Sequence, residues 1–277
     1  MEVSFQTFRI ERDLNAQKLL KKYSGHKSRM EDILSNIGVL VATGNEQSYF
    51  FSLKRKCQRV ANRFRRVCNL NKSQSITEEK NPHLKLRKGL VSTALSGQDL
   101  FANMAAAKLT KKFYLEIGAC YPIKINNTYI LEKYFDWQGR SIEIDEELVK
   151  IFNFERKNAC VCKDATLLNY SDFLSINGFP IDIGYLSIDI DPAFQSLNVL
   201  SRIPFAKYRF AAITFEHDAY LSRGKIRKVQ RQLLRHYGYE LLVKDVKAYN
   251  VDKYEDWWIH PDLVSTDIRA EIKEFFK

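Results

Sequence analysis

Acidic side chains follow most of the short apolar runs between residues 113 and 218. They are Glu116, Glu143, Asp145, Asp164, Asp189, Asp191, Glu216 and Asp218, with Gly118 and His217 among them. In an open α/β sheet, ligands bind beyond the carboxyl ends of the parallel strands. The sequence therefore predicts a ligand pocket whose rim is formed largely by carboxylates.

The first of these runs ends in Leu-Glu-Ile-Gly-Ala, where Gly118 lets the backbone pass close to a ligand. The Gly-x-Gly-x-x-Gly pattern that holds a diphosphate is absent, and Glu116 precedes the glycine. A carboxylate repels a diphosphate but tolerates a cationic sulfonium. This loop, which includes Ala119, therefore favours S-adenosylmethionine over a dinucleotide. Tyr121, in the same loop, is a weaker candidate for contact with the substrate.

The next two runs supply further candidates for binding this cofactor. An acid at the end of the second strand commonly accepts hydrogen bonds from ribose hydroxyls, and Glu143 has that place. Asp145 is a second candidate there, and it is also suited to cap the helix that follows. After the third run, Asp164 and Ala165 are placed to contact the adenine edge. A helix cap is the alternative role for Asp164.

Two neighbouring strand ends carry the candidates for catalysis. Asp189 and Asp191 are two residues apart and so share a face, and Glu216, His217 and Asp218 close the next strand. His217 is the expected general base near neutral pH. The alternative is a divalent cation, Mg²⁺ or Mn²⁺, held by Asp189, Asp191, Glu216 or Asp218, because clustered carboxylates repel one another unless a cation or a proton joins them.

Aromatic residues near the C-terminus are candidates for contact with the acceptor. Trp257, Trp258 and His260 lie in Glu-Asp-Trp-Trp-Ile-His-Pro. They are candidates for stacking on a sugar ring at the mouth of the predicted pocket. Packing inside the core is the alternative, and it is the commoner role of tryptophan pairs.

Apolar runs and helical patterns alternate from residue 96 onward. Strands are predicted at 113–117, 141–144, 159–162, 183–190, 209–215, 239–245 and, as an edge strand, 257–260. Helices are predicted at 96–108, with Ser96 as a candidate cap, and at 127–134, 146–154, 170–176, 194–201 and 223–237. This alternation predicts a parallel sheet with helices on both faces.

The charge of the chain is concentrated at one end. Residues 1–90 hold 19 Lys and Arg against 8 Asp and Glu, whereas residues 91–277 hold 25 of each, so the first part carries the whole net charge of +11. We predict a basic, mainly helical region at 1–90 and a catalytic domain at 91–277. Residues 53–68 combine an apolar stripe with many cations. They are expected to dock on the domain, lie on an anionic membrane surface or bind nucleic acid.

The run from Phe113 to Asp145 resembles the opening of the FkbM-type methyltransferases. The matching residues are Glu116, Gly118, Ala119, Asn127, Thr128, Leu131, Glu132, Trp137, Gly139, Ile142 and Glu143. The resemblance covers about residues 96–265 in ordered blocks, with departures at Pro122 and Pro192. It implies a Rossmann-like class I methyltransferase sheet, mostly parallel with an antiparallel edge strand. It also adds Asn127 and Thr128 to the residues expected to bind the cofactor.

The resemblance further implies O-methylation, most often of a sugar hydroxyl in a glycan or a glycosylated small molecule. An RNA ribose methyltransferase that uses the basic region is the main alternative, and a non-catalytic protein with the same fold is another. No apolar run is long enough to span a bilayer, and the N-terminus lacks the pattern of a signal peptide. We therefore expect a cytoplasmic location, with peripheral membrane contact as a variant.

Overall fold

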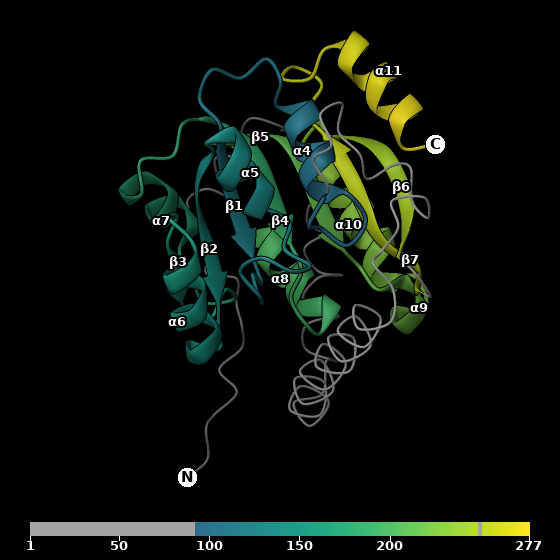
Figure 1. Cartoon of the computed structure of the whole chain (residues 1–277). Helices are drawn as coiled ribbons and strands as arrows, with labels where there is room; N and C mark the ends of the chain where they lie inside the picture. Colours follow the sequence, from purple (N-terminus) through teal and green to yellow (C-terminus); the bar gives the residue numbers. More distant parts are fainter. Residues whose placement is uncertain (1–91, 249–250) are drawn as a thin grey trace, which may run out of the picture.

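A computed structural model describes residues 92–248 and 251–277. The predicted basic region 1–90, including residues 53–68, lies outside the described residues. Figure 1 shows a central twisted sheet with helices on both faces. None of the described helices is long and apolar enough to cross a membrane.

Seven strands form one sheet in the order β3-β2-β1-β4-β5-β7-β6. The strands are β1 (Phe113–Ile117), β2 (Gln138–Glu143), β3 (Cys160–Cys162), β4 (Asp182–Ile188), β5 (Arg209–Glu216), β6 (Glu240–Ala248) and β7 (Val251–Ile259). The first five are parallel, and β7 lies antiparallel between β5 and β6. This order confirms the predicted Rossmann-like methyltransferase sheet. The segment 257–260 does not form an edge strand, because β7 is an inner strand and β6 has the edge.

Six of the described helices agree with the predicted positions to within a few residues, and the other two, at 219–222 and 266–275, were not predicted. They are α4 (Gln98–Ala105), α5 (Tyr129–Phe135), α6 (Glu146–Glu155), α7 (Tyr170–Ile176), α8 (Ala193–Arg202), α9 (Ala219–Ser222), α10 (Lys225–His236) and α11 (Thr266–Phe275). Two expectations are corrected. Gly97 and not Ser96 has the N-cap position of α4, and the predicted helix 223–237 is preceded by the separate short helix α9, which ends at the left-handed residue Arg223.

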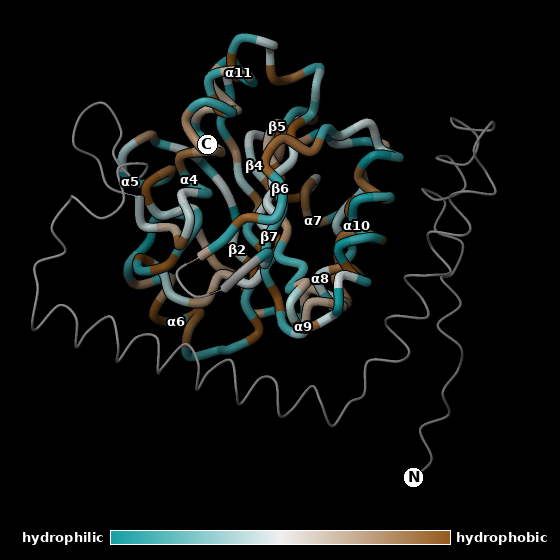
Figure 2. Tube along the Cα trace, turned by 90° about the vertical axis from the view of Figure 1, so that its right-hand side faces the viewer, coloured by the Kyte–Doolittle hydropathy of each residue, from teal (hydrophilic) through white to brown (hydrophobic). Residues whose placement is uncertain are grey.

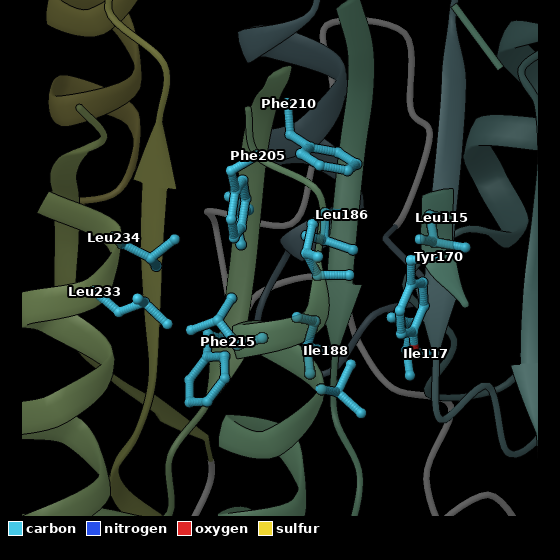
Figure 3. Packing of buried hydrophobic residues seen from close by; sticks show 14 of the residues in the cluster. Leu115, Ile117, Tyr170, Leu186, Ile188, Phe205, Phe210, Phe215, Leu233 and Leu234 are labelled. Carbon is cyan, nitrogen blue, oxygen red and sulfur yellow. The ribbon is translucent and has the colours of Figure 1, made fainter. Parts of the chain in front are cut away.

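A large apolar core lies on the face covered by α7, α8 and α10 (Figure 3). Alternate residues of β1 and β4, such as Leu115 and Leu186, meet side chains such as Leu233 from α10 there. A second core on the opposite face joins α4, α5 and α11 around Trp257. Because side chains alternate along a strand, every second residue at a strand end points to the same face as this second core. That alternation decides which predicted residues meet.

Candidate functional site

Gly118 brings the loop after β1 against the end of β4. Its φ is +84°, and a Cβ at this position would lie 1.9 Å from the carbonyl oxygen of Asp189. Backbone bonds fix the same point, because the Gly118 N–H donates to Ile142 (2.9 Å) and the Asp189 N–H donates to Ile117 (3.0 Å). Only glycine fits this contact. The close approach of the Gly118 backbone, which the sequence predicted toward a ligand, is made in the structure to the backbone at the end of β4.

Glu143, at the end of β2, holds the loop from the other side. Its carboxylate accepts hydrogen bonds from the backbone N–H groups of Cys120 (2.9 Å), Ile144 (2.8 Å) and Asp145 (3.1 Å). A carboxylate has about four lone-pair positions, so these three bonds leave one of them for a further donor. The side chain is half-buried and lies at the rim. It therefore joins the glycine loop to β2 at the place predicted for the ribose.

Glu116 lies one layer below this rim and is 2% exposed. It accepts hydrogen bonds from Thr128 Oγ1 (2.9 Å) and Ser141 Oγ (2.7 Å). Burial raises the pKa of Glu116, although the nearby Arg156 and the hydrogen bonds favour its charged form. Thr128 is also fully buried. The prediction that these two side chains contact the cofactor is corrected, because both are enclosed and instead support the loop.

Arg156, at the end of α6, ties the loop to the body of the domain and was not predicted. Its side chain is fully buried, and its guanidinium uses all five N–H donors. They reach Glu132 Oε2 (3.0 Å), the Pro122 carbonyl (2.8 Å), Asn126 Oδ1 (3.0 Å), the Tyr114 hydroxyl (3.1 Å) and Thr128 Oγ1 (3.1 Å). Its charge also compensates the buried carboxylate of Glu116. Arg156 thus holds the part of the loop from Pro122 to Thr128 against the body of the domain.

The remaining cofactor candidates lie along the same edge of the sheet. Asn127 Nδ2 donates to Ser187 Oγ on β4 (3.0 Å), and Ala119 is buried in a small cluster with α6. Asp145 caps α6 by accepting from Glu147 N and Leu148 N, which confirms its role as an N-cap.

Asp164 accepts from the backbone N–H and the hydroxyl of Thr166, both at Oδ1, so it forms a turn after β3. Ala165 follows it and is buried. The alternative role of Asp164 as a local cap is therefore present. Any contact of Asp164 and Ala165 with adenine stays a prediction.

The predicted acid cluster assembles at the ends of β4 and β5. Burial raises the pKa of Asp218, the charges of Asp191 and Asp189 add to the shift, and a hydrogen bond involving Glu216 opposes it. Burial and the charges of Asp218, Glu216 and Asp191 raise the pKa of Tyr220. The cluster does not form the predicted metal site. In the described ranges, no three of these four acids bring their oxygens within 4.8 Å of one another.

His217 lies on the other face of the sheet, and the prediction that it is the general base is wrong. β5 continues through Glu216, so the next side chain points the opposite way. His217 is fully buried, its Nδ1 accepts from the Ala219 N–H (3.2 Å), and its Nε2 lies 3.5 Å from Asp256 Oδ1. No substrate at the strand ends can reach it.

His217, Asp245 and Asp256 have the spacing of a metal site, but Arg231 already occupies the position of the cation. Its guanidinium donates to Asp256 Oδ1 (2.7 Å) and Oδ2 (2.7 Å) and to Asp245 Oδ1 (2.9 Å). Burial disfavours the Asp256 carboxylate, but Arg231 and His217 outweigh it and lower the pKa of Asp256 to about 2. This group is therefore a structural ion pair that joins α10 to β6 and β7.

Glu255 is a buried acid beside the acid cluster that the sequence did not predict. It lies directly opposite Glu216 in the antiparallel pair of β5 and β7, so the two side chains share a face. Gln98 Nε2 donates to Glu255 Oε2 (2.8 Å) and also contacts the Tyr254 hydroxyl (2.9 Å). Burial, with a contribution from Asp189, raises the pKa of Glu255 to about 7. In the sequence, Glu255 is the first residue of the run Glu-Asp-Trp-Trp-Ile-His-Pro, in which only the aromatic residues and His260 were considered.

The aromatic candidates are corrected as well. Trp257 stacks on Phe101 (4.9 Å between ring centroids) in one core, and Trp258 belongs to the other; they are 1% and 0% exposed. Because β7 is antiparallel, His260 lies beside Ala211, at the opposite edge from the strand ends. None of the three lies at the mouth of the pocket. Tyr121 is half-buried in the glycine loop, and its contact with the substrate stays a prediction.

No protein-family model matches the chain, and no curated protein matches its sequence. Among solved structures, it is similar to the Dnmt2 methyltransferase of S. pombe, at 17% identity, 53% of this chain, 48% of that chain and a TM-score of 0.40. It is also similar to a mutant of MtNAS in complex with S-adenosylmethionine, with 12% sequence identity over 58% of this chain and 60% of that chain and a TM-score of 0.36. A third similar structure is an rRNA methylase from Streptococcus thermophilus, with 10% sequence identity over 58% of this chain and 94% of that chain and a TM-score of 0.38. The chain thus spans about half to three fifths of the first two proteins. Likenesses this distant carry no functional argument, and the fold is assigned from the strand order.

Proposed function

We propose that the protein is an S-adenosylmethionine-dependent O-methyltransferase that acts on a sugar hydroxyl. The observation that carries this proposal is the Glu143 carboxylate at the end of β2, bonded to the backbone of the Gly118 loop in a sheet of the methyltransferase strand order. In such sheets the ligand lies beyond these strand ends. The fourth lone-pair position of Glu143 would accept a ribose hydroxyl.

The charge of the rim supports a cationic cofactor. The backbone of Asp189 lies against Gly118, and Asp189, Asp191, Glu216 and Asp218 gather at these strand ends. A sulfonium beside these carboxylates would be stabilised by their charge. Asp164 and Ala165 would contact the adenine. A diphosphate would meet the clustered carboxylates of the β4 and β5 ends, which argues against a dinucleotide.

The transfer itself needs alignment and a proton acceptor. The acceptor oxygen would form a bond to the methyl carbon as the carbon–sulfur bond breaks, leaving S-adenosylhomocysteine, while the hydroxyl proton passes to a carboxylate. Alignment of this kind contributes on the order of 7–11 kcal/mol. With His217 excluded, Asp189 and Glu216 are the groups at the strand ends that would take the proton.

A divalent cation does not fit the acid cluster as it stands, because its four carboxylates do not converge on one point. Transfer that is unchanged by a chelator is the expected result.

The sugar acceptor rests on the resemblance to FkbM-type methyltransferases between residues 96 and 265. A cytoplasmic location, and contact of residues 53–68 with nucleic acid or a membrane, are further proposals about the same protein. A non-catalytic binding protein is the alternative that the transfer assay below would reveal.

Thermal unfolding of the full chain with S-adenosylmethionine tests the proposal. At a ligand concentration of one hundred times Kd, binding stabilises by about 2.7 kcal/mol, which for a domain of this size is a shift of roughly 5–10 °C. Glu143→Gln should remove the shift, and Glu155→Gln, on the exposed side of α6, should keep it. Asp189→Asn should bind the cofactor but transfer no label to a panel of glycans. A wild-type protein that shows no shift at saturating cofactor would refute the proposal.

A further inference from the structure

The segment from β4 to β6 carries a strong local excess of positive charge. Residues 192–239 contain nine Lys and Arg but only two acids, Glu216 and Asp218, whereas residues 91–277 as a whole carry no net charge. Three of the nine cations, Arg209, Arg227 and Arg231, form ion pairs with acids outside the segment. The other six have no ion pair in the part of the chain that the structure describes.

These six exposed cations define one surface, which we call the basic face. They are Arg202, Lys207, Arg223, Lys225, Lys228 and Arg235. Helices α8 and α10 lie side by side on one side of the sheet, and the contact between Phe205 and Tyr237 (4.7 Å) places the loop before β5 against the end of α10. The six residues therefore follow α10 and the adjoining end of α8. In Figure 2 the outer side of α10 is mainly hydrophilic.

The spacing on α10 makes the basic face a line and not a scattered set. Lys225, Lys228, Gln232 and Arg235 recur at i, i+3, i+7 and i+10, which is one stripe of a helix. At 1.5 Å per residue the stripe is about 15 Å long. Its near end meets α9, which begins directly after Asp218 of the acid cluster, so the stripe leads to the candidate site.

Along α9 and α10, the large apolar side chains that are exposed lie at that near end of the stripe. Tyr220 and Leu221 on α9 are 48% and 57% exposed, whereas the stripe itself presents no exposed large apolar residue. A helix that lies in a membrane surface needs an apolar face to insert, and α10 turns its apolar side to the core. A line of cations that ends at an exposed aromatic ring is instead the pattern that binds a single-stranded nucleic acid, with phosphates on the cations and a base on the ring.

We propose that the basic face binds the backbone phosphates of a single-stranded RNA and leads its strand to the candidate site past Tyr220. That the nucleic acid is RNA rests on the proposed function, because the ribose 2′-hydroxyl is the sugar hydroxyl that RNA offers. Binding of the phosphates does not depend on the cofactor. The two ideas can therefore fail separately.

Fluorescence anisotropy with a labelled RNA of about 20 nucleotides, without cofactor and over a series of salt concentrations, tests the proposal. The full chain is compared with the triple variant Lys225→Gln, Lys228→Gln, Arg235→Gln. The matched control replaces three exposed lysines elsewhere on the domain, Lys111→Gln, Lys133→Gln and Lys157→Gln. Thermal unfolding verifies that both variants are folded.

Each phosphate contact in a single strand contributes about 0.7 to the slope of log Kd against log salt. The triple variant should therefore lose about 2 from the slope, and the control should keep the wild-type slope. Equal slopes for all three proteins would overturn the proposal and assign any binding to residues 1–90. Binding to vesicles of anionic lipid that is stronger than RNA binding and is lost in the same triple variant would overturn it in favour of a membrane surface. If S-adenosylmethionine did not raise the melting temperature but RNA bound with the expected salt dependence, only the proposed methyl transfer would be refuted.

Discussion

Arg156→Met should destabilise the domain by about 3–5 kcal/mol, the usual cost of removing one partner from a buried ion pair. The side chain of Arg156 is fully buried and that of Glu132 is 9% exposed, so solvent screens their interaction little. The variant leaves the carboxylates of Glu132 and Glu116 without their cation. It also removes all five hydrogen bonds to the loop and its surroundings.

Urea unfolding followed by tryptophan fluorescence measures this loss, with Lys157→Met on the exposed neighbouring position as the control. Arg156→Lys keeps the charge but has three donors in place of five, so it should recover part of the stability. Combining Arg156→Met with Glu132→Met should cost less than the sum of the single changes, because it leaves one fewer buried charge unpaired. A loss below about 1 kcal/mol for Arg156→Met would refute the reasoning, since it would mean that the guanidinium does not compensate the buried acids.

Three further changes test single contacts of the site. Burial raises the pKa of Glu255 from an ordinary 4.5 to about 7, so the native state binds this proton more tightly and the free energy of unfolding should fall as the pH rises from about 4.5 to 7. Glu255→Gln should abolish this fall and be about 3 kcal/mol more stable than the wild type at pH 8, as measured by urea unfolding. Parallel curves of unfolding free energy against pH for the two proteins would contradict the assignment. Gly118→Ala should weaken cofactor binding and destabilise the domain more than Gly178→Ala does. Both residues have positive φ, but of these two only Gly118 would bring a Cβ against a backbone oxygen. Equal losses of melting temperature for the two variants would show that the close contact has no effect. Asp145→Ala should cost about 1 kcal/mol through loss of the α6 cap, measured by urea unfolding, and an unchanged midpoint would argue against the two capping bonds.

The order and the type of the elements could be predicted because each one is specified by a local pattern. Short apolar runs gave β1 and β4, and helical periodicity gave α6 and α7 almost to the residue. The acid rim also followed from the sequence, because carboxyl ends of parallel strands meet at one edge. These inferences need only the period of the pattern and the rule for parallel sheets.

The errors arise where a side chain depends on one residue of register or on the direction of a strand. The sequence is consistent with a strand β5 that ends one residue earlier, which would turn His217 toward the site. In the structure the strand continues through Glu216, so His217 points to the other face. The local sequence around Trp257 and Trp258 also does not show the direction of β7, and their burial depends on the antiparallel pairing of β7 with β5. Arg156 was missed because its partners lie 24 to 42 residues away along the chain.

The antiparallel strand also changes the chemistry of the rim. Because β7 begins where β5 ends, it brings Glu255 to face Glu216, and like charges directly opposite on neighbouring strands repel. Burial, with a contribution from the charge of Asp189, raises the pKa of Glu255 to about 7, so this carboxyl keeps its proton to near neutral pH. A cationic ligand at the same rim would favour the charged form of both groups and so would be bound more tightly as they ionise. The strand arrangement of this fold would therefore add to the electrostatic preference for the proposed positively charged methyl donor, a preference that the five parallel strands would provide only in part.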